Sequence, residues 1–103
     1  MATLTLTELK CIRKQDISGS DEPELYVAGL KVWDGKMAKG DVEPLSESRP
    51  FSDSVLLELK ERDGKKAKSL GTWTINDTPT TSAKTLTATS SGYHYELKYS
   101  VAA

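Results

Sequence analysis

The sequence predicts an all-β protein, an antiparallel sandwich of two sheets with about seven to eight strands. Three observations support this fold class. Apolar and polar residues alternate with a period of two in several segments, most clearly over residues 93–101. Clusters of Gly, Pro, Asp and Ser separate these segments, and none has the period of a helix. The apolar content of 37% is consistent with a thin two-layer sandwich, in which half of each strand faces water.

The strongest pattern is a pair of strands joined by a charged loop. Residues 55–59 alternate as expected for a strand with one buried face. An acidic and basic loop follows, and the second strand begins with the pair Leu70-Gly71. Trp73 and Ile75 lie on one face of that strand. This unit is the centre of the predicted fold.

The N-terminal part predicts three more strands. Residues 3–12 form the first strand, and the apolar phase changes across Thr7-Glu8, which predicts a single-residue bulge. Two alternating runs, 24–27 and 30–33, are separated by Ala28-Gly29. A two-residue separation of this kind predicts a tight hairpin, although Ala is less favoured there than Asn or Asp.

The segment that follows has the weakest pattern. Val42 and Leu45 would point to opposite faces of an ideal strand, and Pro44 lies between them. We therefore expect at most a short, irregular edge segment here, because proline suits an edge strand better than a central one. Phe51 is expected to fill the core below it.

The C-terminal part predicts a final pair of strands. Residues 76–82 form a polar connector, residues 85–89 a short amphipathic strand, and residues 93–101 the last strand. On the last strand the three tyrosines, a leucine and a valine share one face, whereas His94 and its polar neighbours share the other. We interpret the whole chain, residues 1–103, as one β-sandwich domain.

Composition excludes several classes of function. The 14 basic and 15 acidic residues leave no overall positive field, so a nucleic-acid partner is not expected. Cys11 is the only cysteine, so no intrachain disulfide can form. No basic start with an apolar run resembles a signal peptide, and no segment is long enough to predict a transmembrane span. The sequence predicts a cytoplasmic protein, or one exported without a cleavable signal.

Two segments resemble the C-two (C2) domain, a calcium- and lipid-binding β-sandwich. The first, DISGSDEPELYV at residues 16–27, is similar to the first loop and strand of that family. The second, with acidic residues followed by Leu70-Gly71, is similar to its later metal-binding loop. The resemblance implies a cluster of four possible calcium ligands: Asp16, Asp21, Glu61 and Asp63.

The second loop departs from the family pattern in its charges. The family usually has an aspartate at the position of Glu61 and another just before the Leu-Gly pair, where this chain has lysine. Lys65, Lys66 and Lys68 all lie in this loop. Each would repel a divalent cation, at roughly 2 to 3 kcal/mol per pair of unit charges ~6 Å apart. We expect a weak or vestigial calcium site, and we expect the three lysines to face an anion or a lipid head group.

Other candidate groups favour structural roles. His94 is the only histidine, so catalytic arrangements that need several histidines or a histidine beside a nucleophile lack support. Loop carboxylates are normally solvated, and we predict no enzymatic activity and no required cofactor. Tyr26 and Trp33 are candidates for aromatic rings exposed toward a partner, with core packing as the alternative.

We therefore interpret the sequence as a non-enzymatic interaction module of C2-like type. It would act through the acidic and lysine-rich loops at one end of the sandwich, toward a protein partner or an anionic surface. The alternative is a structural or assembly subunit. In that case sheet edges or an aromatic face would pack against copies of itself or against a larger particle.

Overall fold

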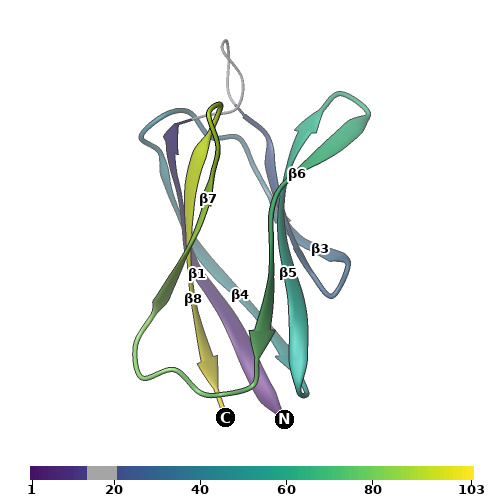
Figure 1. Ribbon diagram of the computed structural model, residues 1–103, viewed down its shortest axis with the longest axis vertical. Helices are drawn as coiled ribbons and strands as arrows, with labels where there is room; N and C mark the ends of the chain where they lie inside the picture. Colours follow the sequence, from purple (N-terminus) through teal and green to yellow (C-terminus); the bar gives the residue numbers. More distant parts are fainter. Residues whose placement is uncertain (14–20) are drawn as a thin grey trace.

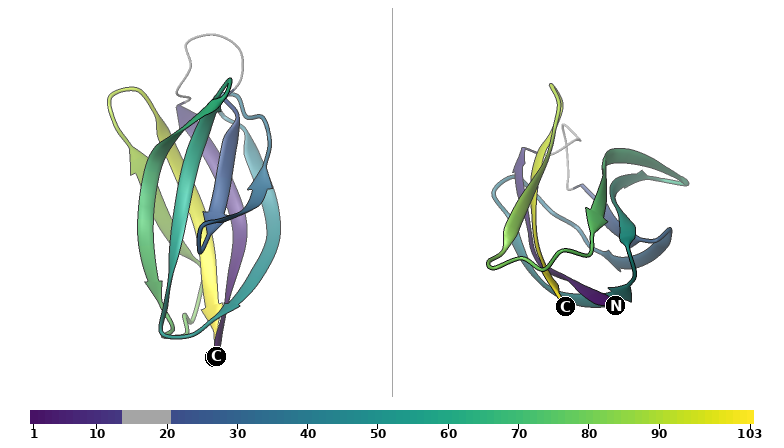
Figure 2. Two further views of the ribbon diagram at one scale, coloured as in Figure 1. Left: turned by 90° about the vertical axis from the view of Figure 1, so that its right-hand side faces the viewer. Right: turned by 60° about the horizontal axis from the view of Figure 1, so that its bottom comes forward.

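A computed structural model describes residues 1–13 and 21–103, apart from the side chain of Asp63. These residues form eight strands and no helix, arranged as two four-stranded antiparallel sheets packed face to face (Figure 1). The predicted sandwich is confirmed. Figure 2 shows the two sheets as separate layers, with both chain termini at the same end.

Each sheet joins strands that are distant in the sequence. The first sheet has the order β4 (Val42–Phe51), β1 (Ala2–Arg13), β8 (His94–Ala102), β7 (Lys84–Thr89). The second has the order β3 (Leu30–Asp34), β2 (Pro23–Val27), β5 (Ser54–Asp63), β6 (Lys66–Asn76). Both termini therefore belong to the first sheet, and the central unit predicted from the sequence belongs to the second.

Side chains that alternate along the strands fill the space between the sheets. Leu57 and Leu59 of β5 are completely buried, as are Leu25 of β2 and Tyr95 of β8. Each fully buried leucine contributes about 1.5 to 3 kcal/mol relative to an exposed one. The period-two pattern thus placed the core correctly, and Trp73 packs against its margin.

The change of phase in β1 is a bulge, as predicted. Leu6 lies opposite Tyr99 and Glu8 lies opposite Lys98, so Thr7 is an extra residue in β1. The Thr7 hydroxyl donates a hydrogen bond to the carbonyl oxygen of Lys98 at 3.2 Å. The extra residue lets β1 keep apolar residues on the inner face on both sides of the bulge.

The predicted hairpin between β2 and β3 is also present. Its turn is Ala28-Gly29, with φ angles of 54° and 81°. Positive φ at both central residues matches the right-handed twist of the two strands. Ala28 therefore adopts a conformation that costs an alanine roughly 1 kcal/mol.

The prediction for the segment after residue 41 was too short. β4 is a ten-residue strand that pairs with β1, and it lies at the edge of the first sheet. It includes Pro44 and Pro50, which an edge strand accommodates because one of its sides has no ladder to complete. Phe51 is buried as expected. Leu45 is buried and Val42 is exposed, in agreement with their expected positions on opposite faces.

The Leu70-Gly71 pair has a packing explanation. The register of β5 and β6 shifts at this point, so that Leu70 is an extra residue whose side chain is buried. A Cβ atom on Gly71 would lie 2.8 Å from the ring of Trp73. Glycine is thus required because the indole ring lies directly over this part of the backbone.

Candidate functional site

Exposed lysines gather at the end of the sandwich opposite to the chain termini. This end carries the loop 35–41, the turn 64–65 and the turn 90–93 (Figure 1). Five lysines on the first two of these segments, or directly beside them, are exposed: Lys36, Lys39, Lys65, Lys66 and Lys68. We call this group the lysine end. None of the five makes an ion pair with a described residue.

The β5–β6 hairpin places three of these lysines. The ladder continues to the pair Asp63 and Lys66, so that only Gly64 and Lys65 form the turn. Gly64 has a φ angle of 64°, which glycine adopts without strain. Lys66 and Lys68 therefore belong to strand β6, not to a loop as we expected, because the two-residue turn Gly64-Lys65 lets the ladder continue to Asp63 and Lys66. The strand fixes the spacing of their Cα atoms.

Backbone hydrogen bonds hold the loop that carries the other two lysines. Asp21 and Met37 exchange both backbone hydrogen bonds, each at 2.9 Å. The backbone NH of Gly40 donates to the carbonyl oxygen of Cys11 at 2.7 Å. The carboxylate of Asp41 accepts a hydrogen bond from the backbone NH of Ala38 at 2.8 Å. The backbone NH of Gly35 also donates to the carbonyl oxygen of Pro23 in β2 at 3.2 Å, so the loop is attached to both sheets.

Asp21, one of the four predicted calcium ligands, is engaged in the core. The Tyr95 hydroxyl donates a hydrogen bond to its Oδ2 atom at 2.5 Å, and both side chains have no exposed surface. Burial and, secondarily, this hydrogen bond raise the pKa of Tyr95 far above its usual range. The pair connects β8 of the first sheet to the segment just before β2, the strand that begins at Pro23 in the second sheet.

The other predicted ligands are only partly described. Glu61 is buried and accepts a hydrogen bond from the backbone NH of Glu22 at 3.5 Å. Asp16 and the side chain of Asp63 lie outside the described residues. Within residues 1–13 and 21–103, no group of three or more His, Cys, Asp or Glu side chains is placed to hold a metal ion. Calcium takes about six to eight oxygen ligands. The described side chains alone do not fit it, and the calcium site stays a prediction.

A third buried carboxylate, that of Glu24, lies on the outer face of the second sheet. Arg62 donates two hydrogen bonds to Glu24, from Nε at 2.7 Å and from an Nη atom at 3.1 Å. The Tyr26 hydroxyl donates to the same carboxylate at 2.9 Å, and the Lys31 ammonium lies 3.6 Å from it. The hydrogen bonds from Arg62, followed by that from Tyr26, hold the pKa of Glu24 below its usual value despite burial. Glu24 is not among the predicted site residues, since an outward glutamate in a strand looks like a solvated residue from the sequence.

The two candidate aromatic residues have different surroundings. Tyr26 is half-buried on the outer face, and the Lys60 ammonium lies 4.6 Å from the centre of its ring. Trp33 lies opposite Leu25 in the ladder and packs against the core. Because a bulge in β3 at Val32 changes its phase, these two rings do not form one exposed aromatic face.

His94 has a surface position on β8. Its side chain is about one-third exposed, and its Nε2 atom lies 3.9 Å from a carboxylate oxygen of Glu96. This agrees with the outward position and the Glu96 neighbour that the alternation in the last strand predicts. Cys11 is buried in the core and, as the only cysteine of the sequence, forms no intrachain disulfide.

Comparisons with known proteins show the fold of this chain. No protein-family model and no curated protein matches the sequence. Among solved structures, one described as the structure of a C2 domain matches with a TM-score of 0.62 and 12% sequence identity. The match covers all of this chain and all of that one. The chain is therefore an antiparallel β-sandwich with the C2 fold, as its resemblance to that family implied. No helix among the described residues has the length and apolar character needed to span a membrane.

Proposed function

We propose that the protein is a non-enzymatic binding module that attaches its lysine end to an anionic lipid surface. The observation that carries this proposal is the contrast between the two charge types at that end. Five lysines are exposed without an ion pair to a described residue. By contrast, Asp21 and Glu61 are buried and Asp41 is bonded to the backbone, whereas Glu22, beside Lys36, is an exposed carboxylate. The described part of this surface therefore presents more lysines than exposed carboxylates to a partner.

The expected strength follows from the number of lysines. A lysine near an anionic membrane surface contributes about 1 kcal/mol, and this contribution decreases with added salt. Lys65, Lys66 and Lys68 together would then supply about 3 kcal/mol, or roughly a 100-fold difference in binding. The ladder between β5 and β6 holds their backbone in place, so little order must be gained on binding.

Sedimentation with lipid vesicles tests the proposal. We would compare vesicles of phosphatidylcholine alone with vesicles that contain phosphatidylserine, at low and high salt. The test variant replaces Lys65, Lys66 and Lys68 with glutamine. A matched control carries three equal charge changes outside the lysine end: Arg49→Gln, Lys84→Gln and Lys98→Gln.

We expect the test variant to lose nearly all retention on the phosphatidylserine vesicles and the control to keep it. Equal losses in both variants would mean that only net charge matters, and the proposal would be wrong. Equal binding of the unmodified protein to both vesicle types would also refute it. A parallel measurement in EDTA addresses calcium, because a weak or vestigial site predicts that retention persists without the metal.

The alternative is an assembly subunit, and one observation favours it. Leu30 and Leu56 are 72% and 46% exposed, and they lie beside the same turn, since the backbone NH of Ala28 donates to the carbonyl oxygen of Leu56. Exposed leucines beside a sheet edge suit contact between protein surfaces. Light scattering over a range of concentrations tests this reading. It predicts association that Leu56→Ser reduces and that the lysine variant leaves unchanged.

A further inference from the structure

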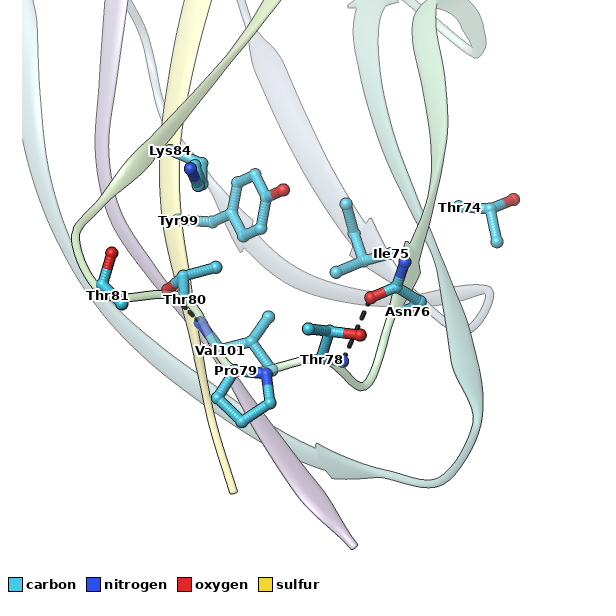
Figure 3. A pocket seen from close by; sticks show the side chains of 10 residues that line it. All are labelled: Thr74, Ile75, Asn76, Thr78, Pro79, Thr80, Thr81, Lys84, Tyr99 and Val101. Atoms are coloured by element: carbon cyan, nitrogen blue, oxygen red, sulfur yellow. Dashed lines mark hydrogen bonds between the residues drawn. The ribbon is translucent and has the colours of Figure 1, made fainter.

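A cavity of about 420 Å³ lies at the end of the sandwich away from the lysine end. One wall is the end of β6, with Ile75, and another is β8, with Tyr99 and Val101 (Figure 3). The connector between β6 and β7 closes it on a third side. Its volume is within the range of about 300 to 1,000 Å³ that is usual for small-ligand sites.

The connector is a fixed wall of this cavity. The backbone NH of Thr80 donates to the carbonyl oxygen of Val101 at 2.9 Å. In return, the NH of Val101 donates to the Thr80 hydroxyl at 3.1 Å. The backbone NH of Thr78 donates to Oδ1 of Asn76 at 3.0 Å. The segment that the sequence predicts as a polar connector is thus bonded to both sheets, and the cavity exists without a ligand to organise it.

One side of the lining is apolar. The side chains of Ile75, Pro79 and Val101 line the cavity together with the ring of Tyr99, which points into it (Figure 3). The apolar surface they offer is small, since Ile75 and Val101 are largely buried, and it would fit the C–H face of a flat molecule. Since the lining includes only one aromatic ring, a nucleobase held between two rings would not be accommodated.

The rest of the lining offers hydrogen-bonding groups to a ligand. The hydroxyls of Thr78, Thr81 and Tyr99 and the amide nitrogen of Asn76 make no hydrogen bond to a described residue. These groups can donate to, and the hydroxyls can also accept from, neutral polar groups of a ligand. Lys84 is the single charged residue of the lining, and it makes no ion pair with a described residue.

We propose that this cavity binds a saccharide of one or two sugar rings. A sugar ring combines an apolar C–H face with a rim of hydroxyl groups, which matches the two sides of the lining. The absence of Asp and Glu from the lining disfavours a cationic ligand. A phosphorylated ligand would be expected to meet more than one cation. Lys84 would favour a sugar that carries a carboxylate over its neutral counterpart.

Ligand-observed saturation-transfer NMR on the intact protein tests this proposal. The probes are the methyl glycosides of glucose, galactose, mannose and N-acetylglucosamine, together with glucuronic acid, at millimolar concentrations. Three conservative variants remove one polar group each: Tyr99→Phe, Asn76→Asp and Thr78→Val. Asn76→Asp keeps the oxygen that accepts from the Thr78 backbone, so the turn is retained. Thr72→Val is the matched control, because Thr72 is exposed on β6, the strand that contains Asn76, and lies outside the cavity.

We expect at least one probe to bind. Each variant should lower the affinity for that probe by about three- to tenfold, the effect of one lost hydrogen bond. The control should bind as the unmodified protein does, and Lys84→Met should weaken only glucuronic acid. The absence of binding for all five probes would overturn the proposal. So would an equal effect of Thr72→Val and Thr78→Val. The glutamine variant of the lysine end should leave sugar binding unchanged, which separates this proposal from that for lipid.

Discussion

Removal of a single hydroxyl group tests how the two sheets are joined at the lysine end. Three tyrosines of the C-terminal part differ in what their hydroxyls contact. The Tyr95 hydroxyl donates to the buried carboxylate of Asp21, and the Tyr93 hydroxyl donates to the carbonyl oxygen of Leu70 at 2.9 Å. The Tyr99 hydroxyl makes no hydrogen bond to a described residue. Substitution by phenylalanine changes only the hydroxyl in each case.

The structure predicts a ranking of the three variants. A hydrogen bond to a buried carboxylate contributes about 1.5 to 3 kcal/mol, and one between neutral groups contributes about 1 kcal/mol. We therefore expect Tyr95→Phe to lower the free energy of unfolding by about 2 kcal/mol and Tyr93→Phe by about 1 kcal/mol. Tyr99→Phe should stay within about 0.5 kcal/mol of the unmodified protein. For a domain of this size, each kcal/mol corresponds to roughly 4 to 8 °C in the melting midpoint.

Urea denaturation at neutral pH measures these values, and a double-mutant cycle with Asp21→Ala isolates the pair, because alanine leaves no acceptor for the Tyr95 hydroxyl. We expect a coupling energy of about 1 to 2 kcal/mol between Tyr95 and Asp21. If Tyr95→Phe and Tyr99→Phe had equal free energies of unfolding, the hydrogen bond between Tyr95 and Asp21 would contribute nothing to stability, and our reasoning would be refuted. Alkaline pH gives a second check. Because the pKa of Tyr95 is raised by folding, its contribution is complete below the unfolded value of about 10 and decreases as pH rises above it.

Three further predictions follow from individual sites. The pKa of Glu24 is lowered in the folded state. The Glu24–Arg62 pair therefore stabilises the protein fully at a pH above 4.5, the pKa of Glu24 in the unfolded chain, and this stabilisation is lost as the pH falls through the lower pKa of the folded state. The stability of Glu24→Gln in urea should therefore depend less on pH between about 5 and 3, and parallel pH profiles would contradict this assignment. Ala28→Asn should raise the free energy of unfolding by about 0.5 to 1 kcal/mol, because asparagine tolerates the positive φ of this turn; an unchanged midpoint would show that the alanine is not strained. For calcium, a weak site with a dissociation constant near the added millimolar concentration predicts a gain of only about 0.4 kcal/mol, measured as a small rise in the melting midpoint. A rise of more than 10 °C would show that the lysines do not weaken the site as we infer.

Local pattern was sufficient to predict the fold class and most strand positions. The period-two alternation identified the inner face of β5 and β8, since side chains of a strand alternate whatever their neighbours are. The phase change at Thr7-Glu8 and the two-residue turn at Ala28-Gly29 are also local features, and the structure has both. β4 was underestimated because two prolines mask a strand whose tolerance for them depends on its edge position in the sheet.

The candidate sites depended on the tertiary structure. The sequence identified the lysines of residues 65–68 as candidates. Their lack of ion pairs with described residues depends on the directions in which the described carboxylates point in the folded protein. Asp21 faces inward because Tyr95, 74 positions away, supplies a hydroxyl there. Glu24 is buried because the pairing of β2 with β5 brings Arg62 beside it.

The cavity near the termini is likewise formed by β6, β8 and the connector between β6 and β7. By itself, therefore, the sequence determined which residues alternate between core and surface. Only the assembled sheets decided which charges are neutralised and which polar groups remain free for a ligand, because both depend on contacts between residues distant along the chain.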